Sequence, residues 1–108
     1  MNPGFPYPLS DASRFPPNNV SRMQASAKAF RQLSRQASIL MNKVENDTHF
    51  AKQLRAAAQI DDKDKVKHLI SSTIDTRFEV SYTPGGLNVK LRPADVQECS
   101  RLDVFVCW

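Results

Sequence analysis

The sequence predicts an α+β fold in which two or three N-terminal helices pack on a small C-terminal antiparallel sheet. Apolar residues recur every three or four positions between residues 20 and 73, as they do along one face of a helix. After residue 78 the apolar period changes to two, which is typical of half-buried strands. Because the chain has only 108 residues, we expect one domain over residues 20–108.

Residues 1–19 precede the first helix and are expected to form a flexible arm. Five of the seven prolines lie here, and proline fixes φ and donates no backbone hydrogen bond. Phe5, Tyr7 and Phe15 are interleaved with them, although linkers that stay disordered usually lack aromatic residues. Two interpretations stay open: a disordered leader, or an arm whose rings dock on a neighbouring subunit or another partner.

A first helix is predicted from Ser21 to Val44. Asn19 or Ser21 can cap it, and no proline or glycine occurs from Val20 to Ala58. One apolar seam follows the spacing of the a and d positions of a heptad: Met23, Phe30, Leu33, Ala37, Leu40 and Val44. Such a seam packs within the subunit or pairs helices between subunits, and three heptads do not decide between the two.

Two shorter helices are expected to follow. Asn46, Asp47 and Thr48 favour caps over helix interiors, so the first helix should kink or stop there, before a second helix that runs to about residue 59. Asp61 or Asp62 then caps a third helix that ends near residues 71–73. The inward-facing side chains expected on these two helices are Phe50, Leu54, Ala57, Val66, Leu69 and Ile70.

A β-hairpin is predicted over residues 78–91. Pro84 and Gly85 stand where a type II turn requires them. Pairing Tyr82 with Leu87 gives one apolar face and sets Glu79 opposite Lys90 as an ion pair on the other.

The segment after the hairpin is expected to add a third strand. Pro93 ends the hairpin, and residues 94–100 form one helical turn or a loop. Apolar residues alternate again in 102–108, and three strands are stable where two are marginal. We expect the end of the chain to be buried in the sheet or in a contact with another subunit, and the first helix to pack across the sheet's apolar face.

Positive charge is concentrated in the first half of the chain. Residues 1–60 hold eight basic and three acidic side chains, and no acid occurs between Ser21 and Val44. This segment is a solvated helix face, or a surface for nucleic acid, an acidic protein or anionic lipid. The basic side chains that would neutralise phosphates are Arg22, Lys28, Arg31 and Arg35. No RNA-stacking sheet and no helix-turn-helix pattern accompanies them.

No motif of catalysis, metal binding or cofactor binding stands out. Cys99 and Cys107 are eight residues apart, which fits neither a redox pair nor a zinc knuckle, and His49 and His68 belong to no HExxH motif. The acidic run at residues 61–65 lacks the glycine and the closing glutamate of a calcium loop. We therefore expect no cofactor and no metal. The two cysteines act as small hydrophobes, or form a disulfide between subunits in an oxidising setting.

The sequence also bears on location. No stretch approaches the roughly 20 consecutive apolar residues of a membrane helix, and residues 1–6 lack the basic-then-apolar order of a secretory signal. We expect an intracellular, cytoplasmic protein without a membrane span.

Residues 65–74 and 78–89 together resemble small proteins of endospore-forming bacteria, some of which are inner spore-coat components. The resemblance covers Lys65 to Leu91, about a quarter of the chain, and rests on the run from Lys65 to Ile74 and on the hairpin from Phe78 to Val89. It implies an assembly role in the developing spore and incorporation into the spore coat. It carries no catalytic residue.

The function expected from these observations is that of a non-enzymatic structural protein that self-associates, as a homo-oligomer, or docks on a protein partner. Helices on one face of a three-stranded sheet leave its edges to be covered by a neighbour. The expected contact residues are Phe5, Tyr7, Phe15, Phe30, Leu33, Leu40, Val44, Phe105 and Trp108. The alternative is a nucleic-acid-associated protein that uses the basic first helix, and an enzyme of unknown reaction is a minor third possibility. A Cys–His nucleophile pair is not excluded by the sequence, although a thiol near a terminal strand usually acts as a small hydrophobe.

Overall fold

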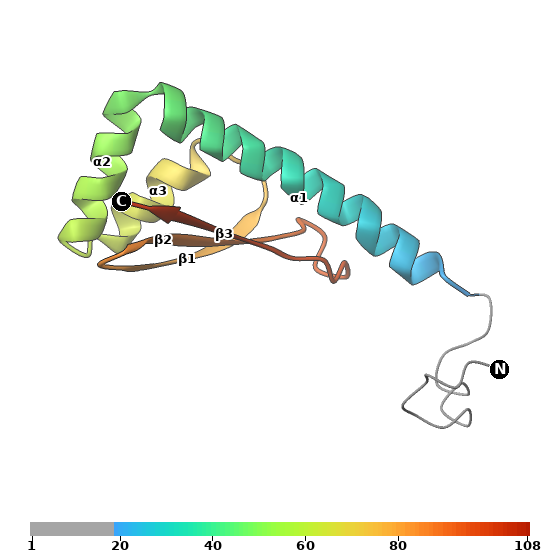
Figure 1. The fold of residues 1–108 in the computed structure, drawn as a ribbon. Helices are drawn as coiled ribbons and strands as arrows, with labels where there is room; N and C mark the ends of the chain where they lie inside the picture. The colour runs from blue at the N-terminus through green and yellow to red at the C-terminus, as the bar shows by residue number, and fades with distance from the viewer. Residues whose placement is uncertain (1–18) are drawn as a thin grey trace, which may run out of the picture.

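The computed structural model describes residues 19–108, which form three helices followed by a three-stranded antiparallel sheet. The elements are α1 (Ser21–Asn46), α2 (Thr48–Gln59), α3 (Lys63–Ser71), β1 (Arg77–Thr83), β2 (Gly86–Arg92) and β3 (Leu102–Cys107). Figure 1 shows the helices on one face of the sheet, with α1 running along the sheet and continuing past its end. The α+β prediction is confirmed.

The helix boundaries follow from capping side chains. The carboxylate of Asp47 accepts a hydrogen bond of 3.0 Å from the backbone N–H of Phe50, which ends α1 and starts α2. Asp62 caps α3 in the same way through Lys65, at 3.2 Å. Asp61, the other candidate cap, instead has φ 56°. Aspartate tolerates this left-handed conformation, which turns the chain between α2 and α3.

The sheet has the order β1-β2-β3, with each strand antiparallel to its neighbour. The predicted hairpin register is confirmed: Tyr82 pairs with Leu87, and Val80 with Val89. The predicted third strand pairs with β2 and sets Val106 opposite Leu87. Alternate residues of all three strands pack toward the helices: Phe78, Val80, Tyr82, Leu87, Val89, Leu91, Leu102, Val104 and Val106.

Two predicted details of the hairpin are wrong. Neither glycine of the turn has a positive φ, so the turn is not of type II, and negative φ at both central residues suits type I. The ion pair of Glu79 is formed with Arg92 and not with Lys90: Arg92 Nε lies 3.4 Å from Glu79 Oε2, without the alignment of a hydrogen bond. Diagonal neighbours on a twisted pair of strands are within reach of a side chain as long as arginine.

The core lies between the helices and the sheet. Its largest fully buried side chains are Leu33, Leu40, Val66, Ile70, Val89 and Leu91. On α1 the buried face includes Ala29, while Phe30 is 40% exposed. Ala29 stands four residues before Leu33 and so lies beneath the same face, whereas Phe30 is displaced toward the helix flank. The predicted seam therefore has the right period but includes Phe30 where the core takes Ala29.

Polar contacts attach α1 to the C-terminal half of the chain. Gln36 Oε1 accepts a hydrogen bond of 2.7 Å from the backbone N–H of Asp75, just before β1. Ser26 and Ser100 share a hydrogen bond of 2.8 Å between their hydroxyl groups. The Ser100 hydroxyl also donates to the carbonyl of Ser26. The loop that joins β2 to β3 is thus held beneath the first half of α1.

Candidate interaction surfaces

The first half of α1 leaves two large apolar side chains partly or mostly exposed in the described part of the chain. Met23 is 71% exposed and Phe30 is 40% exposed. With Ala27 between them they form what we call the α1 apolar surface, along a shallow groove whose other side is Cys99 and Ser100. The spacing of seven residues sets Met23 and Phe30 on the same side of the helix. In Figure 1 this stretch of α1 lies at the end that extends past the sheet.

The charged side chains that line the groove beside the α1 apolar surface are all positive. Arg22, Arg31 and Arg101 line the groove together with the apolar side chains. None of the three forms an ion pair with a carboxylate in the described part of the chain, whose ion pairs are Lys43–Asp47 and Arg92–Glu79. The surface can therefore accept an apolar group that is flanked by acidic side chains.

Other predicted contact residues of the seam lie inside the subunit. Leu33 and Leu40 are each 1% exposed and belong to the core, and Val44 packs against them half-buried. From Leu33 to Val44 the seam therefore packs within the subunit, as in the first of the two alternatives, whereas Met23 and Phe30 of the same seam stay exposed. The assignment of Leu33 and Leu40 to a contact between subunits is corrected to a place in the core, because a partner cannot reach side chains that β2, β3 and the other helices already cover.

Phe105 and Trp108 are partly occupied by contacts within the chain. Phe105 is 56% exposed on the open face of the sheet, where its ring lies against Gly86. The indole N–H of Trp108 donates a hydrogen bond of 2.8 Å to the carbonyl of Thr83, and 36% of the residue stays exposed. Phe5, Tyr7 and Phe15, with most of the predicted arm, lie outside the described residues.

The basic side chains of α1 do not form one patch. Lys28, Arg31 and Arg35 are exposed and follow the spacing of one helix face, opposite the buried face. Arg22 is rotated by roughly 180° from Arg31 at about 100° per residue and faces the groove from its other side. The four residues predicted to bind phosphate thus divide into a stripe of three and one separate arginine.

The two cysteines lie far apart in the fold and are both exposed with free thiols. Cys99 lines the groove beside α1, with its sulfur 3.9 Å from the Ser26 hydroxyl. Cys107 ends β3 next to Trp108. A disulfide between subunits stays a prediction for both.

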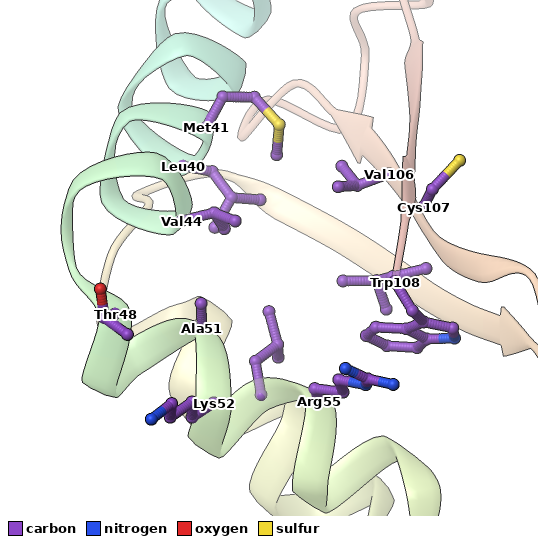
Figure 2. Close-up of a pocket in the computed structure, with 12 residues that line it drawn as sticks. Leu40, Met41, Val44, Thr48, Ala51, Lys52, Arg55, Val106, Cys107 and Trp108 are labelled. Atoms are coloured by element: carbon purple, nitrogen blue, oxygen red, sulfur yellow. The ribbon is translucent and has the colours of Figure 1, made fainter.

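An apolar pocket opens between the second half of α1, α2 and the sheet (Figure 2). Its volume is about 260 Å³. Its lining residues are Leu40, Met41, Val44, Thr48, Ala51, Lys52, Leu54, Arg55, Leu87, Val106, Cys107 and Trp108. Figure 2 shows Lys52 and Arg55 on the α2 side and the Trp108 ring across from them. The pocket is not visible in the sequence, because its lining comes from four elements that are separated along the chain.

A perturbed titratable group links β1 to the turn between α2 and α3. The Tyr82 hydroxyl donates a hydrogen bond of 2.5 Å to Asp61 Oδ1. This bond, with desolvation and the charge of Asp61, raises the pKa of Tyr82 to about 12. No nucleophile or base lies in hydrogen-bond contact with the pair among residues 19–108, so the contact fastens two parts of the fold together.

Two kinds of feature are absent from residues 19–108. No three side chains of His, Cys, Asp or Glu gather there as metal ligands do. No helix of this region combines the length and the apolar character that crossing a membrane requires.

Comparison with known proteins identifies a family for the chain. A family model described as YuzC spore coat inner layer protein matches residues 20–102. This range takes in the three helices, the hairpin and the first residue of β3. The resemblance to inner spore-coat proteins, read from residues 65–89, is confirmed over a much longer part of the chain. No curated protein and no solved structure matches.

Proposed function

Since the chain belongs to the family of YuzC spore coat inner layer proteins, we propose that it is a non-enzymatic structural protein of the inner coat of the spore. In this proposal the chain is held in the layer by contacts with further copies of itself or with another coat protein. Family membership supports the location, and the α1 apolar surface supports the contacts.

The proposed contacts are supported chiefly by the exposure of Met23 and Phe30 at one end of the molecule. Isolated exposed apolar residues are common on protein surfaces. These two differ because they share one side of a helix that extends past the sheet, with a groove beside them. Full burial of a methionine or phenylalanine side chain contributes about 1.5–3 kcal/mol, so a partner that covers both gains useful affinity.

The test measures whether the protein is incorporated into the spore coat. A fluorescently tagged chain, expressed in sporulating cells of an endospore-forming bacterium, should collect around the developing spore and appear in the extracted coat fraction. The variant with Met23→Ser and Phe30→Ser should be lost from that fraction, because its attachment surface is polar. Ile60→Ser is the matched control, since Ile60 is 76% exposed and lies between α2 and α3, away from the groove. Normal incorporation of the double variant would refute the attachment surface.

The predicted arm is proposed as a second attachment. Its aromatic residues Phe5, Tyr7 and Phe15 would dock on a neighbouring subunit, while residues 20–108 fold as one domain. Light scattering at several concentrations, repeated after deletion of residues 1–19, measures this contribution. A protein that stays monomeric at every concentration, with and without the arm, would count against self-association.

A second candidate function rests on the stripe formed by Lys28, Arg31 and Arg35. The stripe faces away from the core, and these three cations form no ion pair within the described residues. Phosphates of a nucleic acid would release counterions on binding such a stripe, so affinity should fall steeply between low and moderate salt. Random duplex DNA titrated at both salt concentrations tests this function. Absence of binding at low salt removes it.

A further inference from the structure

We propose that two copies of this chain form a symmetric dimer, in which the loop between β2 and β3 of each copy covers the α1 apolar surface of the other. The inference rests on the proposed function and identifies the partner of the attachment surface as a second copy. It starts from a second exposed patch, which lies beside the groove and has the opposite charge.

The second patch is on the loop between β2 and β3. Val96 is 73% exposed and stands between Asp95 and Glu98, with no basic residue from 94 to 100. Two local hydrogen bonds stabilise the conformation of the loop. The backbone N–H of Gln97 donates a 2.9 Å hydrogen bond to Asp95 Oδ1, and the backbone N–H of Glu98 donates one to the Asp95 carbonyl. It therefore presents one apolar side chain flanked by two carboxylates.

The two patches are neighbours on one end of the molecule. The hydrogen bonds between Ser26 and Ser100 hold the loop against α1 beside the groove. Figure 1 shows the loop under the first half of α1, at the end opposite α2. A surface made of two adjoining, complementary halves can pair with a rotated copy of itself, because a two-fold axis sets each half of one copy on the other half of its partner.

Charge selects this arrangement over direct pairing of the two grooves. Groove against groove would bring Arg22, Arg31 and Arg101 of both copies together, and like charges across an interface disfavour binding. When the loop of one copy packs on the groove of the other, two carboxylates lie near three arginines, and the two-fold axis repeats this contact. Neither carboxylate forms an ion pair within residues 19–108, so both are available to a partner. Val96 would then contact Met23 and Phe30.

Charge exchange tests the proposal without changing the apolar side chains. In a dimer of Arg31→Glu chains, and equally in a dimer of Glu98→Lys chains, the reversed charge meets a like charge on the partner. Each variant alone should therefore be monomeric at concentrations where the parent dimerises. A mixture of the two variants restores an opposite charge at both contacts and should dimerise. Light scattering reports the mass, and circular dichroism confirms that each variant is folded.

A matched control separates specific pairing from a general charge effect. Arg35→Glu makes the same charge change one turn further along the stripe, outside the groove lining, and should dimerise like the parent. Glu79→Lys adds positive charge on the open face of the sheet and should do the same. If the mixture of Arg31→Glu and Glu98→Lys stays monomeric while the parent dimerises, the proposed contact is overturned. Equal loss of dimer in the controls also overturns it.

Cys99 supplies a second readout, because it lies in the groove at the edge of the proposed contact. The two-fold axis should bring the two Cys99 thiols near one another, so mild oxidation should cross-link parent dimers and Cys107→Ser dimers. Cys99→Ser dimers should resist this cross-link. Cross-linking through Cys107 alone would overturn the arrangement. Coat incorporation with a failed charge exchange would leave the proposed function standing and remove this dimer.

Discussion

The ring of Phe105 lies where a side chain on Gly86 would have to be. A Cβ added at Gly86 would stand 2.6 Å from Phe105 Cζ and closer still to the carbonyl oxygen of Val106. Gly86 begins β2 opposite Cys107, so the phenylalanine ring covers bare backbone at the edge of the turn. Phe105, the aromatic side chain on the open face, therefore has a role within the subunit.

Gly86→Ala is expected to destabilise the protein by about 1–3 kcal/mol, since backbone and ring must both move. Gly85→Ala is the matched control. Its added Cβ would meet Thr83 Oγ1 at 3.6 Å, an ordinary contact. Because Gly85 has no positive φ, alanine should raise stability there by roughly 0.4–1 kcal/mol. Urea unfolding measures the free energy of unfolding of both variants. Equal stability of the two would contradict the close packing of Phe105 on Gly86.

The pocket of Figure 2 should accept a larger side chain on α2. Ala51 is half-buried in its lining, and Ala51→Leu adds apolar volume where the chain leaves about 260 Å³ free. We expect a gain of about 0.5–2 kcal/mol in the free energy of unfolding. Ala56→Leu places the same change on the exposed side of the same helix and should be nearly neutral. Equal effects of the two substitutions would contradict the pocket.

The contact between Tyr82 and Asp61 makes stability depend on alkaline pH. The pKa of Tyr82 is raised from 10.0 to about 12, chiefly by the hydrogen bond to Asp61, so the folded state favours the protonated phenol. The stabilisation is complete below pH 10 and is lost as the pH rises through 12. The phenolate absorbance of the parent minus that of Tyr82→Phe isolates this titration. In Asp61→Asn the midpoint should move toward 10, and an unchanged midpoint would exclude Asp61 as the cause.

Asp47 should make the stability of the protein decrease at acidic pH. Its hydrogen bonds with Lys43 and with the backbone of Phe50 hold the pKa of Asp47 below the ordinary 3.8. A depressed pKa contributes stability that is present above 3.8 and is lost as the pH falls through the lower folded value. Thermal unfolding between neutral and strongly acidic pH should therefore show a smaller acid loss in Asp47→Asn. An equal acid loss in the parent and in Asp47→Asn would contradict this role of Asp47.

The elements with strong local signals could be predicted from the sequence. Asp47 and Asp62 each cap a helix by a hydrogen bond to the backbone N–H three residues later. A short stretch of sequence is therefore enough to predict both caps. The hairpin register follows from a two-residue period on either side of a two-residue turn, and one slip would expose every apolar side chain. These features depend mainly on residues that are close to one another in the sequence.

Features that depend on distant partners could not be predicted. Ala29 and Phe30 both lie within one turn of Leu33, so the helical period alone does not specify which of them the core takes. The packing of Phe105 on Gly86 and the pocket lining require knowledge of strand order and helix placement. The groove beside α1 was missed for the same reason, although exposed Met23 and Phe30 belong to the predicted seam.

The order of the sheet has a consequence for the path by which the chain folds. Each strand pairs with the strand next to it along the chain, and α2 packs on its sequence neighbours α1 and α3. Short loops cost little entropy to close, so helices and hairpin should assemble early and rapidly. The Ser26–Ser100 contact, in contrast, closes a separation of 74 residues. Docking of the first half of α1 against the loop before β3 is therefore expected to be the last and slowest event of folding.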